Sequence, residues 1–119
     1  MSAPEIYWLT DDQWDTILLA VPRVAVRDRR VFEAILHVLS TAMPWHDLPE
    51  DFGITYRTAW NRYQKWQQEG LLDPVLQVFL RSCTPTEQRL WTLRLQEGAR
   101  QRAIKHGTRK RPLLMSAEN

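Results

Sequence analysis

The helical spacing of apolar residues between proline and glycine breaks most constrains how this chain can fold. Three segments show this spacing and end at such a break: residues 11–21 before Pro22, residues 29–43 before Pro44, and residues 56–68 before Gly70. Apolar residues that recur every three or four positions favour amphipathic α-helices. The alternation at Val24 and Val26 is too short to predict a strand. We therefore expect an all-α fold, a small helical bundle.

Local signals mark where the first two helices begin. Thr10 and Gln13 have the pattern of a capping box, in which each side chain bonds the backbone N–H of the other residue. Asp28 can cap the second helix, whose broad apolar face makes it the expected central helix. We expect the core to contain Trp14, Phe32, Ile35, Leu36, Leu48, Tyr63 and Trp66.

The stretch MPWHDLPEDFGITYRTAWNRYQKW, residues 43–66, combines a tight turn with a two-faced helix. Pro49 and Gly53 break the chain, and Thr55 is a suitable cap for a helix that Gly70 closes. Aromatic rings cover large areas, so we expect the face that gathers them to be buried. That face comprises Tyr56, Ala59, Trp60, Tyr63 and Trp66. A short helix, a glycine-bearing turn and this helix together predict a helix-turn-helix at about residues 45–68.

The opposite face of this predicted helix carries basic and amide residues, with no acid before Glu69. Asn can pair with adenine and Arg with guanine at base edges in the major groove. Early residues of a recognition helix usually reach the bases, and later ones touch the backbone. We therefore expect Arg57, Thr58 and Asn61 nearest the bases, and Arg62 and Lys65 nearer the phosphates. The alternative interpretation is a merely solvated polar face.

Charge divides the chain unevenly. Residues 1–83 contain 8 Lys/Arg and 11 Asp/Glu, which gives a net charge of −3. Residues 84–119 contain 8 Lys/Arg and 3 Asp/Glu, which gives a net charge of +5. We divide the chain there into a helical DNA-binding domain and a C-terminal helix with a basic tail. The helix is expected to begin around Pro85, and Gly98 and Gly107 weaken its continuity, so we expect a flexible tail. The tail is either a solvated end or an arm that contacts phosphates through Arg100, Arg102, Lys105, Arg109, Lys110 and Arg111.

Other kinds of site lack the residues they need. Cys83 is the single cysteine, which excludes an internal disulfide and a thiolate zinc cluster, and the 3 histidines are scattered. The 4 glycines form no phosphate-binding loop. No apolar run approaches the roughly 20 residues of a membrane span, and the acidic first residues do not form an export signal. We expect a cytoplasmic protein with no catalytic residues, metal ligands or cofactor.

Four motifs occur in one order and spacing: LTDDQWDTI (9–17), DRRVFEAILHVL (28–39), PWHDLPEDFG (44–53) and TAWNRYQKW (58–66). Together they resemble the amino-terminal domain of the insertion-sequence-five family of bacterial transposases, over about residues 7–80. The resemblance implies a helical DNA-binding domain that recognises the terminal inverted repeats of the element. In that family the domain precedes a catalytic domain of ribonuclease-H-like fold with an Asp-Asp-Glu triad.

The chain departs from this family after Leu80, where a helix is predicted in place of the first catalytic strand. Glu97 and Glu118 are isolated, and two-metal phosphoryl transfer needs converging carboxylates. We therefore expect sequence-specific binding of double-stranded DNA without enzymatic activity. The alternative function is a protein–protein module, in which the face around Asn61 or the C-terminal helix contacts a full-length transposase. A second copy of the chain is a further expected partner.

Overall fold

The computed structural model describes the backbone of residues 4–118 and the side chains of residues 4–104. The elements are α1 (Asp11–Ala20), the 3-10 turn η1 (Val26–Asp28), α2 (Arg29–Thr41), the 3-10 turns η2 (Trp45–Asp47) and η3 (Glu50–Phe52), α3 (Tyr56–Gln68), α4 (Leu72–Arg81) and α5 (Pro85–Glu118). Within the described backbone all regular structure is helical, which confirms the all-α prediction.

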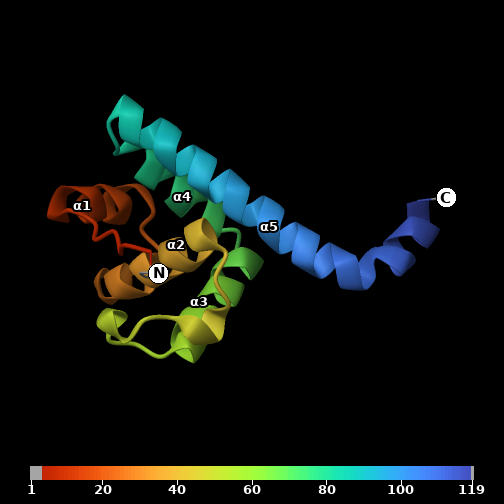
Figure 1. The fold of residues 1–119 in the computed structure, drawn as a ribbon. Coiled ribbons are helices and arrows are strands. Elements are labelled where there is room, and N and C mark those ends of the chain that lie inside the picture. The colour runs from red at the N-terminus through yellow and green to blue at the C-terminus, as the bar shows by residue number, and fades with distance from the viewer. Residues whose placement is uncertain (1–3, 119) are drawn as a thin grey trace.

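Helix α2 lies at the centre of the fold (Figure 1). Every residue from Val31 to Leu39 is buried. This is because α3 and α5 both pack against α2, while α1 packs against α4, and α4 also contacts α3 and α5. The prediction of a central helix from its broad apolar face is confirmed. Two ionisable residues, Glu33 and His37, are buried with the apolar ones.

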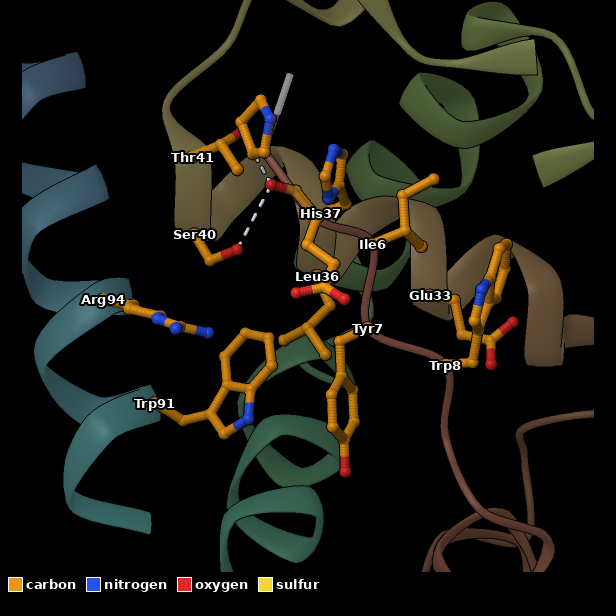
Figure 2. Close-up of a pocket in the computed structure, with 12 residues that line it drawn as sticks. Ile6, Tyr7, Trp8, Glu33, Leu36, His37, Ser40, Thr41, Trp91 and Arg94 are labelled. Carbon is orange, nitrogen blue, oxygen red and sulfur yellow. Dashed lines mark hydrogen bonds between the residues drawn. The ribbon is translucent and has the colours of Figure 1, made fainter. Parts of the chain in front are cut away.

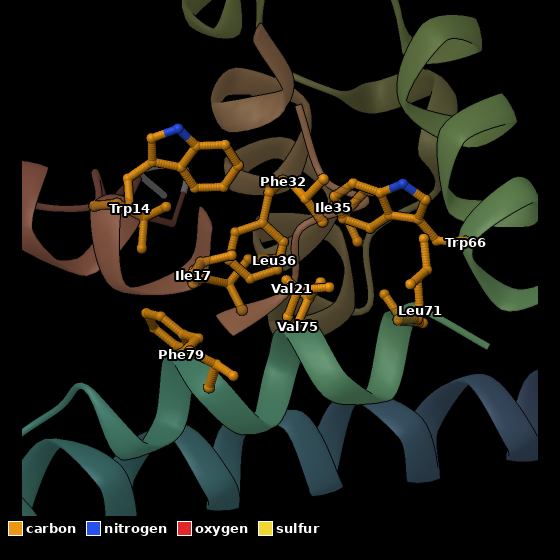
Figure 3. Packing of buried hydrophobic residues seen from close by; sticks show 14 of the residues in the cluster. Trp14, Ile17, Val21, Phe32, Ile35, Leu36, Trp66, Leu71, Val75 and Phe79 are labelled. Carbon is orange, nitrogen blue, oxygen red and sulfur yellow. The ribbon is translucent and has the colours of Figure 1, made fainter. Parts of the chain in front are cut away.

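One hydrophobic core joins all five α-helices. Figure 3 shows the part of this core that α1, α2, α3 and α4 contribute. Phe32 links three of its neighbours, with ring centroids 6.5 Å from Trp14, 6.3 Å from Trp66 and 6.0 Å from Phe79. Five of the seven predicted core residues are buried: Trp14, Phe32, Ile35, Leu36 and Trp66. The other two, Leu48 and Tyr63, are only partly buried and pack against the edges of the core clusters.

Helix α4 is not among the predicted helices. No side-chain hydrogen bond caps its start at Leu71, three residues after the end of α3. Its buried residues nevertheless follow helical spacing, and they complete the core: Leu72, Val75, Val78 and Phe79. Tertiary burial, which a single sequence shows only weakly, therefore fixes this helix.

Helix α5 begins as predicted. The Glu87 N–H donates to Thr84 Oγ1 at 3.2 Å, and the Thr84 N–H donates to Glu87 Oε1 at 2.9 Å. Trp91 is buried, so the core continues past residue 83, where the sequence suggested a division. The helix continues through Gly98 and Gly107, the two glycines expected to weaken its continuity. Gly98 is buried against α2, so packing outweighs its low helix propensity.

Candidate nucleic-acid interface

Local bonds fix both ends of α3. Thr55 Oγ1 accepts a hydrogen bond from the Thr58 N–H at 3.2 Å, as expected of an N-cap. Gly53, with φ of +70°, closes the preceding turn η3 in a backbone conformation that suits glycine. Gly70 has the same φ, and the Leu71 N–H donates to the Trp66 carbonyl at 2.8 Å, which completes a Schellman motif. The predicted bounds of this helix are confirmed.

α3 presents a stripe of polar side chains to solvent. The structure brings four of the predicted site residues together on this stripe, and all four are exposed: Arg57, Thr58, Asn61 and Lys65. The side chains of Arg57, Asn61 and Lys65 form no hydrogen bond or ion pair with the side chains and backbone described for residues 4–104. Because α3 itself contains no Asp or Glu, the stripe is a basic and amide surface with open donors.

Arg62, the fifth predicted site residue on this helix, points away from the stripe. Its guanidinium donates to Asp28, which is 4% exposed. The other carboxylate oxygen of Asp28 accepts the Ala25 N–H at 3.0 Å. Asp28 therefore does not cap α2 with its side chain, so that prediction is wrong. The contacts of Arg62 are inside the protein, and we do not retain it as a phosphate contact.

The prediction that the whole aromatic face of α3 is buried is also wrong. Ala59 and Trp66 are buried, but Trp60 is 38% exposed and Tyr56 is 39% exposed. Trp60 packs edge-on against Trp45 with centroids 5.5 Å apart, and Tyr63 lies 5.0 Å from Trp45. The five aromatic and small residues span too wide an arc of the helix for α2 and η2 to cover them all.

An open groove of about 710 Å³ between η2, α3 and α5 is lined by the rings of Trp45, Trp60 and Tyr63. Met43 and Pro44 contribute its apolar wall, while Gln64 and Arg102 contribute polar groups. It is a largely apolar surface directly beside the polar stripe of α3.

The predicted basic tail divides into two parts. Arg100 donates to Glu97 at 2.6 and 3.0 Å, and this bonding holds the pKa of Glu97 at about 2. Arg102 donates to the carbonyl oxygen of Leu39 at 3.1 Å at the end of α2, and burial lowers its pKa. These two cations therefore have partners within the fold. The side chains of Lys105, Arg109, Lys110 and Arg111 lie outside the described residues.

A second hollow, of about 620 Å³, is lined by the amino-terminal segment, residues 4–8, and by side chains of α2 and α5 (Figure 2). Tyr7 packs against Trp91 with centroids 5.1 Å apart, and the Leu9 N–H donates to Glu33 Oε2 at 2.8 Å. Burial raises the pKa of Glu33 and lowers the pKa of His37, whose Nε2 has no hydrogen-bond partner among residues 4–104. Glu33 was missed from the sequence, although an acid within an apolar stripe is the signal that could have indicated a buried ionisable group.

Other features add no further site. Within residues 4–104, no group of three His, Cys, Asp or Glu side chains could hold a metal ion. Cys83 is buried, and burial raises the pKa of its thiol. Over the described residues, no helix combines the length and apolar character needed to cross a membrane.

Residues 9–76 match the protein family described as "Putative transposase of IS4/5 family (DUF4096)". This match covers more than half of the chain. The chain belongs to the IS4/5 transposase family. The resemblance inferred from the four motifs is confirmed. The family region contains α1, α2, α3 and the beginning of α4, and so includes the exposed stripe.

Two curated proteins are similar to this member of the IS4/5 transposase family. The uncharacterized protein y4sN of Sinorhizobium fredii is 38% identical over 80 residues, which is 61% of this chain and 63% of that protein. The "Insertion element IS402 uncharacterized 16.2 kDa protein" of Burkholderia cepacia is 33% identical over 67 residues, 56% of this chain and 46% of that protein. The similarity thus spans less than two thirds of either relative. No solved structure matches the chain.

Proposed function

We propose that this chain binds double-stranded DNA in a sequence-dependent way. In this proposal the short turn η2, the glycine-bearing segment that follows it and α3, residues 45–68, act as a helix-turn-helix, with α3 as the recognition helix. The observation that carries it is the exposed stripe of α3, where Arg57, Asn61 and Lys65 have open donors and the helix itself contains no acid. Such a helix, capped at both ends and backed by a rigid core, suits the major groove.

The residues of the stripe suit different parts of the duplex. Arg57, Thr58 and Asn61 lie in the first two turns of α3, where a recognition helix meets base edges. Arg and Asn can each form a bidentate pair with one base, worth about 1–3 kcal/mol of discrimination. Lys65 lies a turn further along and suits a phosphate, as do Lys105, Arg109, Lys110 and Arg111 of the tail.

Family membership supports a role in the movement of an insertion element. One relative is named as a protein of the insertion element IS402. We propose that the chain recognises the terminal inverted repeats of such an element, as a separately encoded or truncated part of a transposase or as a regulator derived from one. We place no strand cleavage on residues 4–104, because their carboxylates do not converge as a metal site would require.

Selection from a pool of random duplexes tests this proposal. The full chain should enrich one sequence, and the selected duplex should bind more tightly than a scrambled duplex of the same composition. Affinity for both should fall steeply as salt rises, because phosphate contacts release counterions. Failure to enrich any sequence, or affinity that does not depend on salt, would contradict sequence-dependent DNA binding.

The groove beside α3 favours a second candidate function, the protein–protein module. Its exposed Trp60 and partly buried Trp45 and Tyr63 form a concave apolar surface, and aromatic residues are enriched at protein interfaces. The partner would be a full-length transposase of the same family. If this is the main function, Trp60→Ala should weaken binding to that transposase, and binding should change little with salt. The DNA-binding proposal predicts instead that Trp60→Ala leaves affinity for the selected duplex unchanged.

A further inference from the structure

Arg62 lies on the buried side of α3 although it is charged. It follows Ala59 by three positions and precedes Trp66 by four, and these neighbours are 0% and 2% exposed. Its side chain, 27% exposed, ends at the carboxylate of Asp28. Because Asp28 also accepts the Ala25 N–H, α3 is tied to the turn that directly precedes α2.

We infer that the Arg62–Asp28 pair positions α3 by fixing its rotation about its own axis. The inference rests on the proposed function, because it concerns which side chains α3 presents to DNA. The apolar contacts of Ala59 and Trp66 hold α3 against the core but are not directional. A charge-assisted hydrogen bond is directional, and it joins α3 to a fixed point of the neighbouring element.

The size of the effect follows from helix geometry. The outer ends of side chains lie about 5–6 Å from the axis of an α-helix, so a rotation of about 30° displaces them by about 3 Å. A displacement of that size breaks a bidentate contact between Asn61 and a base, since hydrogen bonds are lost beyond about 3.5 Å. Contacts between long, flexible cations and phosphates tolerate such a shift. The pair should therefore affect discrimination between sequences more than overall affinity.

A role in positioning is distinct from a role in stability. A buried ion pair contributes little net stability, because removing two charges from water offsets most of their attraction. Loss of Arg62 alone would leave Asp28 buried without a partner, which is destabilising. Loss of both charges avoids that penalty. The double variant Asp28→Asn with Arg62→Met removes the ion pair, keeps an acceptor for the Ala25 N–H, and leaves the net charge unchanged.

The chain offers a matched control pair. Arg23 and Glu69 also connect the segment before α2 with the end of α3, at 3.6 Å, since Glu69 is the residue directly after that helix. Their side chains are 64% and 29% exposed. The double variant Arg23→Gln with Glu69→Gln likewise removes one cation and one anion. An exposed pair of this kind contributes little rigidity. The Arg23→Gln/Glu69→Gln variant should therefore bind both duplexes with the wild-type affinities.

The experiment compares the affinities of wild type and both double variants for the selected and the scrambled duplex, after thermal melting has verified that each variant folds. We expect Asp28→Asn/Arg62→Met to reduce the ratio of the two affinities about tenfold, with affinity for the scrambled duplex and its salt slope unchanged. Arg62→Lys keeps the charge but loses the planar fork, and should reduce the ratio about threefold. This single variant decides the question if the double variant does not fold.

Two outcomes would overturn the inference alone. In the first, Asp28→Asn/Arg62→Met or Arg62→Lys keeps the wild-type ratio of affinities for the selected and the scrambled duplex. The other is an equal loss on both duplexes with a salt slope smaller by about one, which would make Arg62 a direct phosphate contact. A wild-type protein with no preference between the duplexes would instead overturn the proposed function, and this inference with it.

Discussion

Gly98 of α5 lies directly against the carbonyl oxygen of Leu39 at the end of α2, so closely that a Cβ atom on Gly98 would be 2.0 Å from that oxygen. One turn later Arg102 donates to the same oxygen at 3.1 Å. These contacts fix where α5 crosses α2 (Figure 1). They therefore also fix the point from which the basic end of α5 leaves the core.

Gly98→Ala should destabilise the fold although alanine is the better helix former. The propensity gain is about 1 kcal/mol, but the added methyl group meets backbone that cannot rotate aside, and overpacking of this kind costs about 1–3 kcal/mol. Thermal melting of the full chain measures the effect. Ala99→Gly, at an exposed neighbour, is the control and should cost only its propensity. A Gly98→Ala variant more stable than wild type would show that α5 does not approach α2 this closely.

Trp66→Ala should destabilise the protein by about 3–5 kcal/mol, because the side chain is 2% exposed and packs against Phe32. Trp60→Ala removes the same side chain from the same helix at a position that is 38% exposed, so its effect should be much smaller. Denaturant unfolding of both variants tests the orientation of α3. Equal losses would mean that α3 is rotated from the arrangement described.

His37 should make stability depend on pH. Burial lowers its pKa in the folded state, so the unfolded chain binds the proton more readily. Its contribution is fully present above about pH 6.5 and is lost as pH falls below that value. Glu33, whose pKa is raised by burial, acts in the opposite sense, since its contribution is lost as pH rises. Melting temperatures between about pH 8 and pH 5.5 should fall in wild type and fall less in His37→Leu. An identical fall in both would exclude His37 as the cause.

Local signals in the sequence predicted the ends of most helices. The Thr10–Gln13 capping box is present, with bonds of 3.1 and 2.9 Å, and Thr55 caps α3. These features depend on residues within a few positions of one another, so one sequence is enough to find them. The start of α4 has no such cap, and the closeness of Gly98 to Leu39 depends on residues far apart in the chain. The spacing of residues within a short segment therefore predicts neither the start of α4 nor the contact between Gly98 and Leu39.

The candidate site was predicted in part for the same reason. Helical spacing placed Arg57, Asn61 and Lys65 on one face, and the structure has them exposed together. The same spacing left Arg62 on the flank of that face. It did not reveal that the Arg62 guanidinium forms an ion pair with Asp28, which lies 34 positions earlier. Spacing within a helix predicts which residues share a face, but not which distant residue pairs with them.

Removal of the chain after Ile104 should weaken DNA binding without loss of sequence preference. This cut keeps Gly98 and Arg102, which hold α5 against α2, and removes Lys105, Arg109, Lys110 and Arg111. If about three of these four cations meet phosphates, the slope of log affinity against log salt should flatten by about 2–3. Arg81→Ala removes one exposed cation from α4 and should leave the slope unchanged. An unchanged slope in the shortened chain would show that the tail does not contact DNA.

The most direct test of the account is the affinity of Asn61→Ala for the selected and scrambled duplexes at one salt concentration. Asn61 is exposed and has open donors on the stripe of α3, and its loss should cost about 1–3 kcal/mol on the selected duplex and little on the scrambled one. Gln77→Ala, an exposed amide on α4, is the matched control and should change neither affinity. Equal loss on both duplexes, or no loss on either, would contradict the claim that α3 reads DNA sequence.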